Sequence, residues 1–210
     1  MFTGLIERIG ILSSRRSGAV LSVGITCDGL DGVSVGDSIA CDGVCLTVTV
    51  VNGKEFQFDL MHETADKTLF PILPIGSKIN IERAMRADTR LDGHFVQGHV
   101  DTIATITALE RLTDDYRITI AIPKEFAPLI VPKGSVSVNG ISLTVIEAGE
   151  TFFSVGIIPH TYNNTSLSLK NSGDRIHCEF DIIGKYIQRW CMLRDGNNSK
   201  PSVTEVLSQW

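Results

Sequence analysis

The stretch Ser38-Ile-Ala-Cys-Asp-Gly-Val-Cys-Leu-Thr-Val48 recurs 97 residues later as Ser135-Val-Ser-Val-Asn-Gly-Ile-Ser-Leu-Thr-Val145. The same shift, without a gap, also pairs Ile6 with Ile103, Ile9 with Ile106, Ile25 with Ile122, Phe56 with Phe153, Thr64 with Thr161, Thr68 with Thr165, Gly76 with Gly173, Ile79 with Ile176 and Glu82 with Glu179. One offset held over about eighty residues indicates two consecutive copies of one domain. We therefore expect domains at residues 1–97 and 98–185, followed by a C-terminal segment at 186–210.

Each copy has the residue pattern of a β domain. Short runs rich in Val, Ile, Thr and Phe alternate with Gly, Asn and Asp at intervals of roughly 8–12 residues. Between Val48 and Phe58, the pair Asn52-Gly53 predicts a hairpin with a type I′ turn. About six short strands per copy favour a small closed barrel, because closure leaves no exposed sheet edge.

The segment after the second copy predicts an amphipathic helix over residues 182–194. Its apolar side chains recur mostly three or four residues apart, at Ile183, Tyr186, Ile187, Trp190, Cys191 and Leu193. Residues 195–201 then have the composition of a helix breaker or linker. The apolar face can pack on its own barrel or against another chain, and the sequence leaves both open.

The composition excludes several classes of partner. The chain has 210 residues, 43% of them hydrophobic and 20% charged, which is ordinary for a globular protein. Its net charge is −5 and Arg15-Arg16 is an isolated basic pair, so neither nucleic acid nor an anionic membrane surface is expected as a partner. No apolar run approaches the roughly 20 residues that cross a bilayer, and the N-terminus does not have the pattern of a signal peptide.

The five cysteines are odd in number and lack CxxC spacing. This usage predicts reduced thiols and a cytoplasmic protein rather than a disulfide framework. Cys41 and Cys45 are four residues apart, but no His lies near them to complete a metal site. We therefore predict no bound metal.

The positions at which the copies differ are candidates for chemistry. Cys45 corresponds to Ser142, so the two copies cannot have identical reactivity. Cys45 can be a small buried apolar residue, the commoner case, or a nucleophile. By the same shift Phe2 corresponds to His99. His94 and His99 are five residues apart and would point to opposite faces of a strand; each can be an ordinary core or surface residue or a proton carrier.

Hydroxyl and charged side chains adjoin these positions in both copies. The threonines 47, 64, 144 and 161 recur in matching places, either for β propensity or to bind a polar heterocycle. Asp59, Glu63, Lys133 and Asp181 lie beside the same strands, where each is more often a solvated charge. The residues thus predict two barrels with two slightly different ligand sites, and no particular reaction.

Several motifs occur together and in a fixed order over residues 1–190. They are Met1-Phe-Thr-Gly-Leu5, Asp/Asn-Gly-x-Cys/Ser-Leu-Thr in both copies, Glu63-Thr64, Glu82-Arg-Ala84, Gly93-His-Phe-Val-Gln-Gly-His-Val-Asp101 and Ile183-Gly-Lys-Tyr186. In these motifs the chain resembles the alpha-chain type of riboflavin synthase. The resemblance implies two six-stranded antiparallel Greek-key β-barrels and a C-terminal helix that joins three chains. It implies dismutation of 6,7-dimethyl-8-ribityllumazine without metal or cofactor, with one lumazine per barrel.

The resemblance also implies site residues. For the N-terminal barrel these are Gly4, Leu5, Ile6, Cys45, Leu46, Thr47, Asp59, Leu60, Met61, His62, Glu63 and Thr64. For the C-terminal barrel they are Gly98, His99, Val100, Lys133, Ser142, Leu143, Thr144, Ile158, Pro159, His160, Thr161, Tyr162 and Asn163. Phe2, Ser38 and Asp181 complete the functional set. The chain departs from the family at Asp42 and Asn139, where Asn and Asp respectively are usual, which weakens any acid–base role for Asn139.

The expected chemistry needs a general base and a nucleophile. The 7-methyl group of the donor lumazine is acidic, and the acceptor ring must be activated by addition. We hypothesise Cys45, or water near it, as the nucleophile, and His99 from the other barrel as the proton carrier, assisted by Ser142 and Thr144. A non-catalytic lumazine- or flavin-binding protein is the main alternative. A flavin-dependent reductase is another, although no Gly-rich dinucleotide loop is present. The resemblance also points to lumazine synthase as a partner.

Overall fold

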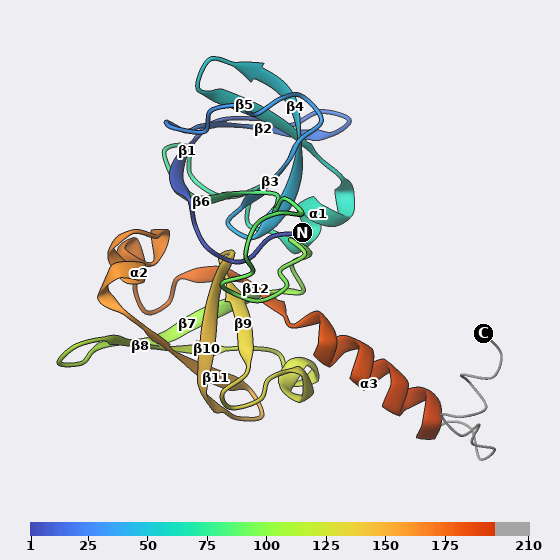
Figure 1. Ribbon diagram of the computed structural model, residues 1–210, viewed down its shortest axis with the longest axis vertical. Coiled ribbons are helices and arrows are strands. Elements are labelled where there is room, and N and C mark those ends of the chain that lie inside the picture. The colour runs from blue at the N-terminus through green and yellow to red at the C-terminus, as the bar shows by residue number, and fades with distance from the viewer. Residues whose placement is uncertain (196–210) are drawn as a thin grey trace.

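The computed structural model describes residues 1–195, which form two β-barrels and a C-terminal helix (Figure 1). The first barrel is closed in the order β1-β2-β5-β4-β3-β6. Its elements are β1 (Arg8–Arg16), β2 (Leu21–Thr26), β3 (Ser38–Cys41), β4 (Val44–Asn52), β5 (Glu55–Leu60), α1 (His62–Lys67) and β6 (Lys78–Arg83).

The second barrel closes in the equivalent cyclic order, β7-β8-β11-β10-β9-β12. Its elements are β7 (Thr102–Arg111), β8 (Tyr116–Ala121), η1 (Lys124–Leu129), β9 (Ser135–Val138), β10 (Ile141–Ala148), β11 (Phe152–Ile157), α2 (Pro159–Asn163), η2 (Ser166–Leu169) and β12 (Arg175–Phe180). In each barrel three hairpin-linked strands lie beside the second strand, which is a Greek key. The predicted pair of six-stranded antiparallel Greek-key barrels is confirmed.

Each barrel has its own apolar core, because alternate residues of every strand point inward. Leu12, Phe58 and Ile79 are fully buried in the first barrel, as Ile106 and Phe153 are in the second. Helix α3 (Ile182–Asp195) follows β12 and extends away from both barrels (Figure 1). The predicted helix is confirmed. The predicted domain boundary between residues 185 and 186 falls within the first turns of this helix. Residues 196–210 lie outside the described residues. Over residues 1–195, no helix is both long and apolar enough to cross a membrane.

The offset of 97 residues holds only from β3 onward. Arg8 of β1 pairs with Ile81, whereas Thr102 of β7 pairs with Cys178, the equivalent of Ile81, so the first strands are offset by 94. Val23 of β2 pairs with Phe58 and Ile118 of β8 with Val155, so the second strands are offset by 95. The loops before β8 and β9 are therefore longer, by one and two residues. The predicted pairings of Ile6 with Ile103, Ile9 with Ile106, Ile25 with Ile122 and Phe2 with His99 are wrong.

The predicted hairpin between β4 and β5 is confirmed, but its turn type is wrong. Asn52 pairs with Glu55, so the turn residues are Gly53 and Lys54. Of these two only Gly53 has a positive φ, of 59°, as in a type II′ turn. The pattern of two positive φ angles that defines a type I′ turn occurs instead at Asp42-Gly43 and Asn139-Gly140.

Those two type I′ turns meet between the barrels. A Cβ atom on Gly43 would lie 2.6 Å from the backbone nitrogen of Gly140, so neither position has room for a side chain. Around them lies a buried polar network in which equivalent residues of the two copies make similar contacts. Asp42 Oδ1 accepts from the backbone N–H of Asn80 and Asn139 Oδ1 from that of His177, both at 2.8 Å. Asn139 is thus an interface residue, with the same role in the second copy as Asp42 has in the first.

Two titratable groups of this network have strongly shifted pKa values. The backbone N–H of Leu69 donates to Nε2 of His177 at 2.8 Å, so this histidine is neutral and its Nδ1–H donates to the Asp42 carbonyl at 2.9 Å. Burial lowers the pKa of His177 to about 4. Burial raises the pKa of Asp42 to about 7. The interface is therefore built from neutral groups only when Asp42 is protonated.

Candidate active site

Two linker segments that precede the barrels, residues 1–5 and 95–100, run antiparallel to each other. Phe2 N–H donates to Val96 O at 2.7 Å, and Val96 N–H to Phe2 O at 3.1 Å. The Glu82 carboxylate accepts from the N–H groups of Thr3 and Gly4 at 2.6 and 3.0 Å. Glu179 equivalently accepts from Gln97 and Gly98 at 2.6 and 2.8 Å. Burial raises the pKa of both carboxyls, against these hydrogen bonds. Phe2 therefore corresponds to Val96 in the second copy.

Each segment then crosses to the other barrel. The N–H of Cys45 donates to Gly98 O at 2.9 Å, and the N–H of Ser142 donates to Gly4 O at 2.8 Å. A Cβ atom on Gly98 would lie 2.5 Å from that of Cys45, so this approach requires glycine. Ile6 packs on the core of the second barrel, and Val100 on that of the first.

The crossing overturns part of the predicted grouping. Gly4 and Ile6 contact the second barrel rather than lying beside Cys45, and Gly98, His99 and Val100 lie beside Cys45 rather than Ser142. Leu5 stays with the first barrel, but in a different cavity from Cys45. The cause is long-range, since the linker strands pair with each other and so direct each chain segment to the barrel it does not precede. His99 is thus beside Cys45 within one chain, and the prediction that it comes from the other barrel is wrong.

The residues around Cys45 form a cavity of about 440 Å³, which we call the thiol site. Its lining is Val44, Cys45, Met61, Glu63, Thr64, Lys67, Thr68, Gly98, His99, Val100, Asp101 and Lys185. Seven of these were predicted as site residues. Asp101 and Lys185 belong to motifs that carry the resemblance but were not predicted as site residues, and Lys67 lies outside those motifs, because a lone charge carries no signal of its own.

Cys45 is half-buried and packs against a small apolar cluster. Phe2 is fully buried, and with Ala40 and Val96 it forms a small cluster against which Cys45 packs. Burial raises the pKa of the Cys45 thiol, and the hydroxyl of Ser38 opposes this shift. The thiol is therefore protonated at neutral pH, and attack by sulfur would need a base. In this structure Phe2 therefore packs in the cluster behind Cys45, and Ser38 forms a hydrogen bond with the Cys45 thiol.

Ser142 lies in an equivalent place with a different partner, and we call Ser142, His94, Gly4 and Gly93 the hydroxyl site. Ser142 Oγ is 2.7 Å from Nδ1 of the buried His94. Burial lowers the pKa of His94, and the charge of Asp181 opposes this. Asp181 itself caps helix α3, since its Oδ1 accepts from the N–H of Ile183 at 2.9 Å. From the sequence, His94 was considered only as a lone histidine. Its position in the glycine-rich linker was the one feature that could have indicated a site residue.

The remaining predicted residues are dispersed. Leu46 and Leu60 lie in the core of the first barrel and Leu143 in that of the second, whereas Thr47 and Thr144 are exposed. Ser38 and Leu5 line a separate cavity of about 540 Å³ beside Arg83. Asp59 accepts from the Ser22 hydroxyl, Lys133 has a φ of 67°, and Tyr162 stacks on Tyr116 with ring centroids 3.8 Å apart. The exposed positions at the start of the two short helices are His62, Ile158, Pro159 and His160; Thr161 is half-buried and Asn163 exposed.

Each barrel matches a known class of domain. The family model described as the lumazine binding domain matches residues 3–84 and again 97–181, one match per barrel. Riboflavin synthase of Bacillus subtilis (strain 168) is 39% identical over 208 residues, covering 98% of this chain and 97% of the relative. Riboflavin synthase of Saccharomyces cerevisiae (strain ATCC 204508 / S288c) is 35% identical, covering 92% and 87% respectively. The chain belongs to the riboflavin synthase family.

Solved structures agree on the fold. The crystal structure of LumP complexed with 6,7-dimethyl-8-(1′-D-ribityl) lumazine superposes with a TM-score of 0.77 at 23% identity, covering 86% of this chain and 99% of that one. LumP complexed with riboflavin gives a TM-score of 0.79 at 24% identity over the same shares. At this level of identity the likeness concerns the arrangement of the two barrels and not the chemistry.

Proposed function

We propose that this chain is a riboflavin synthase: it binds two molecules of 6,7-dimethyl-8-ribityllumazine and transfers a four-carbon unit from one to the other. The products are riboflavin and 5-amino-6-ribitylamino-2,4-pyrimidinedione. The observation that carries this proposal is the pair of equivalent positions, Cys45 and Ser142, held by the same backbone contacts but bearing a thiol and a hydroxyl. Two like sites of unequal chemistry suit a reaction in which two like molecules have unequal roles.

In the thiol site, Cys45 or a water beside it adds to the ring of one lumazine and activates it. His99 lies in the same cavity and is placed to carry a proton there. In the hydroxyl site, Ser142, hydrogen-bonded to neutral His94, can orient or deprotonate the second lumazine. Thr144 and Lys133 of the same barrel are proposed to contact this lumazine as well. No step needs a metal or cofactor, and holding two rings in reactive register supplies much of the acceleration.

We further propose that the reacting pair forms between chains of a cytoplasmic homotrimer, the first barrel of one chain facing the second barrel of the next. Support comes from helix α3, where Ile183, Tyr186, Ile187, Trp190 and Leu193 are 41% to 72% exposed. Such a face needs a partner. Light scattering of Ile187→Glu should report a smaller species than the unaltered chain. Association with lumazine synthase is a further expectation, for which copurification is the test.

The deciding experiment is incubation of the chain with the lumazine alone, followed by absorbance of riboflavin. Riboflavin and the pyrimidinedione should appear in equal amounts. Tight binding without product would favour the alternative, a lumazine- or flavin-binding protein; LumP holds such ligands in its solved complexes. Mixing a Cys45→Ser chain with a Ser142→Ala chain tests the location of the site. Recovered activity in mixed trimers supports a site between chains.

A further inference from the structure

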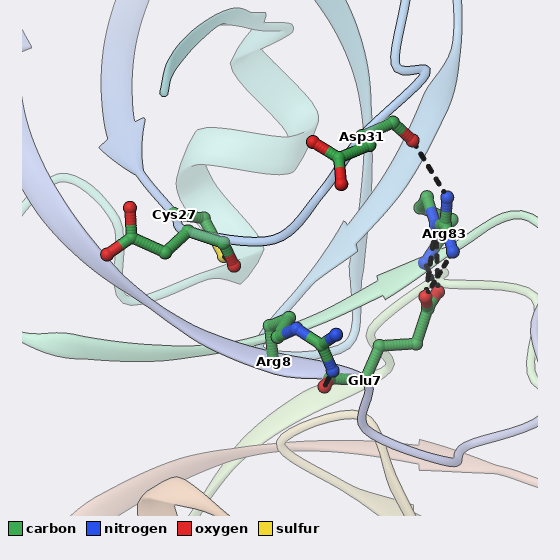
Figure 2. A network of polar contacts seen from close by, with 6 residues as sticks. Glu7, Arg8, Cys27, Asp31 and Arg83 are labelled. Carbon is green, nitrogen blue, oxygen red and sulfur yellow. Dashed lines mark hydrogen bonds and ion pairs between the residues drawn. The ribbon is translucent and has the colours of Figure 1, made fainter. Parts of the chain in front are cut away.

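Each linker segment is followed by a carboxylate that binds a cation. Glu7, which precedes β1, accepts both from the backbone N–H of Arg83, at 2.7 Å, and from its guanidinium, at 2.7 Å for the shortest contact (Figure 2). Asp101, which precedes β7, is the equivalent residue, and its Oδ2 accepts from the backbone N–H of Phe180 at 2.8 Å. Phe180 stands where Arg83 stands in the first copy and has no charge. The cation at Asp101 must come from elsewhere, and it is Lys185, with Nζ at 2.6 Å.

The position of Lys185 is not explained by the stability of its helix. Lys185 lies in the first turns of α3, whose first turn contains no acidic residue. A positive charge near a helix N-terminus is opposed by the helix dipole. The ion pair is also well shielded, since the Lys185 and Asp101 side chains are only 23% and 19% exposed. Lys185 is therefore held at this place by Asp101, against the preference of the helix.

Both partners of this ion pair line the thiol site. Asp101 lies two residues after His99 and three after Gly98, whose carbonyl accepts from the N–H of Cys45 at 2.9 Å. Glu179 holds the other side of this segment, through the N–H groups of Gly98 and His99 at 2.8 and 2.9 Å. The segment that carries His99 over Cys45 is thus fixed by Glu179 at one end and by Asp101 with Lys185 at the other.

We propose that Lys185 is a positioning residue of the thiol site, which through Asp101 holds Gly98 and His99 against Cys45 and ties this site to helix α3. As a role in turnover, the inference rests on the proposed function; as a structural coupling, it does not. The first copy lacks such a coupling, because Glu7 takes its cation from β6 of the same barrel. Only the segment that covers the thiol site depends on α3.

The test compares Lys185→Met, which keeps the aliphatic stem, with Lys185→Arg, which restores the charge. In Lys185→Met the kcat for the lumazine should fall about tenfold with KM changed less than about twofold, since a small misplacement of reacting groups has effects of this order. Lys185→Arg should recover most of the kcat. Lys54→Met is the matched control, because Lys54 and Asp28 form an exposed pair of the same 2.6 Å length far from the site, and it should change nothing.

A second measurement does not depend on turnover. In a Cys191→Ser background, Cys45 is the one thiol of the chain that is not buried, so alkylation by iodoacetamide reports its accessibility. Loss of the Lys185 charge should raise the alkylation rate roughly fivefold by freeing the covering segment, and Arg should reverse this. If Lys185→Met does not fold, Asp101→Asn carries the same expectation. An alkylation rate equal to that of the Lys54→Met control overturns the proposal. An unaltered chain that makes no riboflavin overturns the proposed function and leaves the alkylation result to decide the coupling.

Discussion

The thiol site and the hydroxyl site share a backbone frame and differ in the side chains at their centres. In both, a glycine carbonyl of a crossing linker accepts from the N–H of the second residue of a strand, at 2.9 Å for Cys45 in β4 and 2.8 Å for Ser142 in β10. Cys45 then has Ser38 and His99 as neighbours, whereas Ser142 has His94 at 2.7 Å. Backbone geometry was kept by the duplication because the fold needs it. Side chains were free to diverge, and so the two sites can assign different roles to identical ligands.

The largest effect should come from removing the thiol. Cys45→Ser makes the first site resemble the second and should lower kcat about 1000-fold, a size within the range for a group that takes part in the chemical step. Lumazine affinity, measured by fluorescence titration, should change less than about threefold, because the cavity is unaltered. Cys191→Ser, on the exposed α3, is the control and should retain activity. A parallel loss of binding and turnover would show that Cys45 serves only to shape the cavity.

The interface between the barrels offers the next comparison, Asp42 against Asn139. Asp42→Asn copies the solution of the second barrel, since an amide Oδ1 still accepts from Asn80. Because the pKa of folded Asp42 is raised from 3.8 to about 7, the folded chain holds an extra proton between these pH values. Its contribution to stability therefore falls as pH rises through this window. The variant should be more stable by about 4 kcal/mol at pH 8 and by little at pH 4.

The contribution of His177 to stability depends on pH in the opposite direction to that of Asp42, and it provides an internal check on the Asp42 prediction. Its pKa is lowered from 6.5 to about 4, so the stability it contributes is complete above pH 6.5 and is lost as pH falls toward 4. Asp42→Asn removes only the first effect. Urea denaturation of the variant should thus show stability rising from pH 4 to pH 6.5 and then levelling. A stability gain independent of pH would contradict ionisation of Asp42 as the cause.

These comparisons also show what the sequence could and could not predict. The duplication and the barrels followed from Ser38–Val48 and its repeat, because strand pairing inside each copy is local. The offset of the first two strands was missed, since one- and two-residue insertions leave alternating Ile and Val patterns equally well matched. The crossing of the linkers was missed because it depends on the pairing of Phe2 with Val96, 94 residues apart, which no local pattern encodes. The ion pair of Lys185 with Asp101 was missed for the same reason. It forms because Phe180, at the position of Arg83, offers Asp101 no charge.

A smaller effect is expected from His94, the partner of Ser142. His94→Ala should lower kcat about tenfold, as loss of one orienting hydrogen bond does. His94→Asn should retain most activity, because its amide oxygen can stand near the place of Nδ1. Burial lowers the pKa of His94, so the unaltered enzyme should lose rate only at a pH below the ordinary range of histidine, and the Asn variant should lack this acid limb. Equal activity of the Ala and Asn variants would remove His94 from the account of the hydroxyl site.

The smallest effect concerns the turns that enter β3 and β9. Gly36 has a φ of 95°, and at the equivalent position Lys133 has a φ of 67°, a left-handed conformation that costs a non-glycine residue about 1 kcal/mol. Lys133→Gly should therefore raise Tm by about 2–4 °C. If Lys133 contacts the ligand of the second barrel, as we propose, the same variant should raise KM for the lumazine. Strain retained where the other copy uses glycine points to a functional reason for the lysine. If the variant gains stability and its KM for the lumazine is unchanged, the strain at Lys133 has no functional reason.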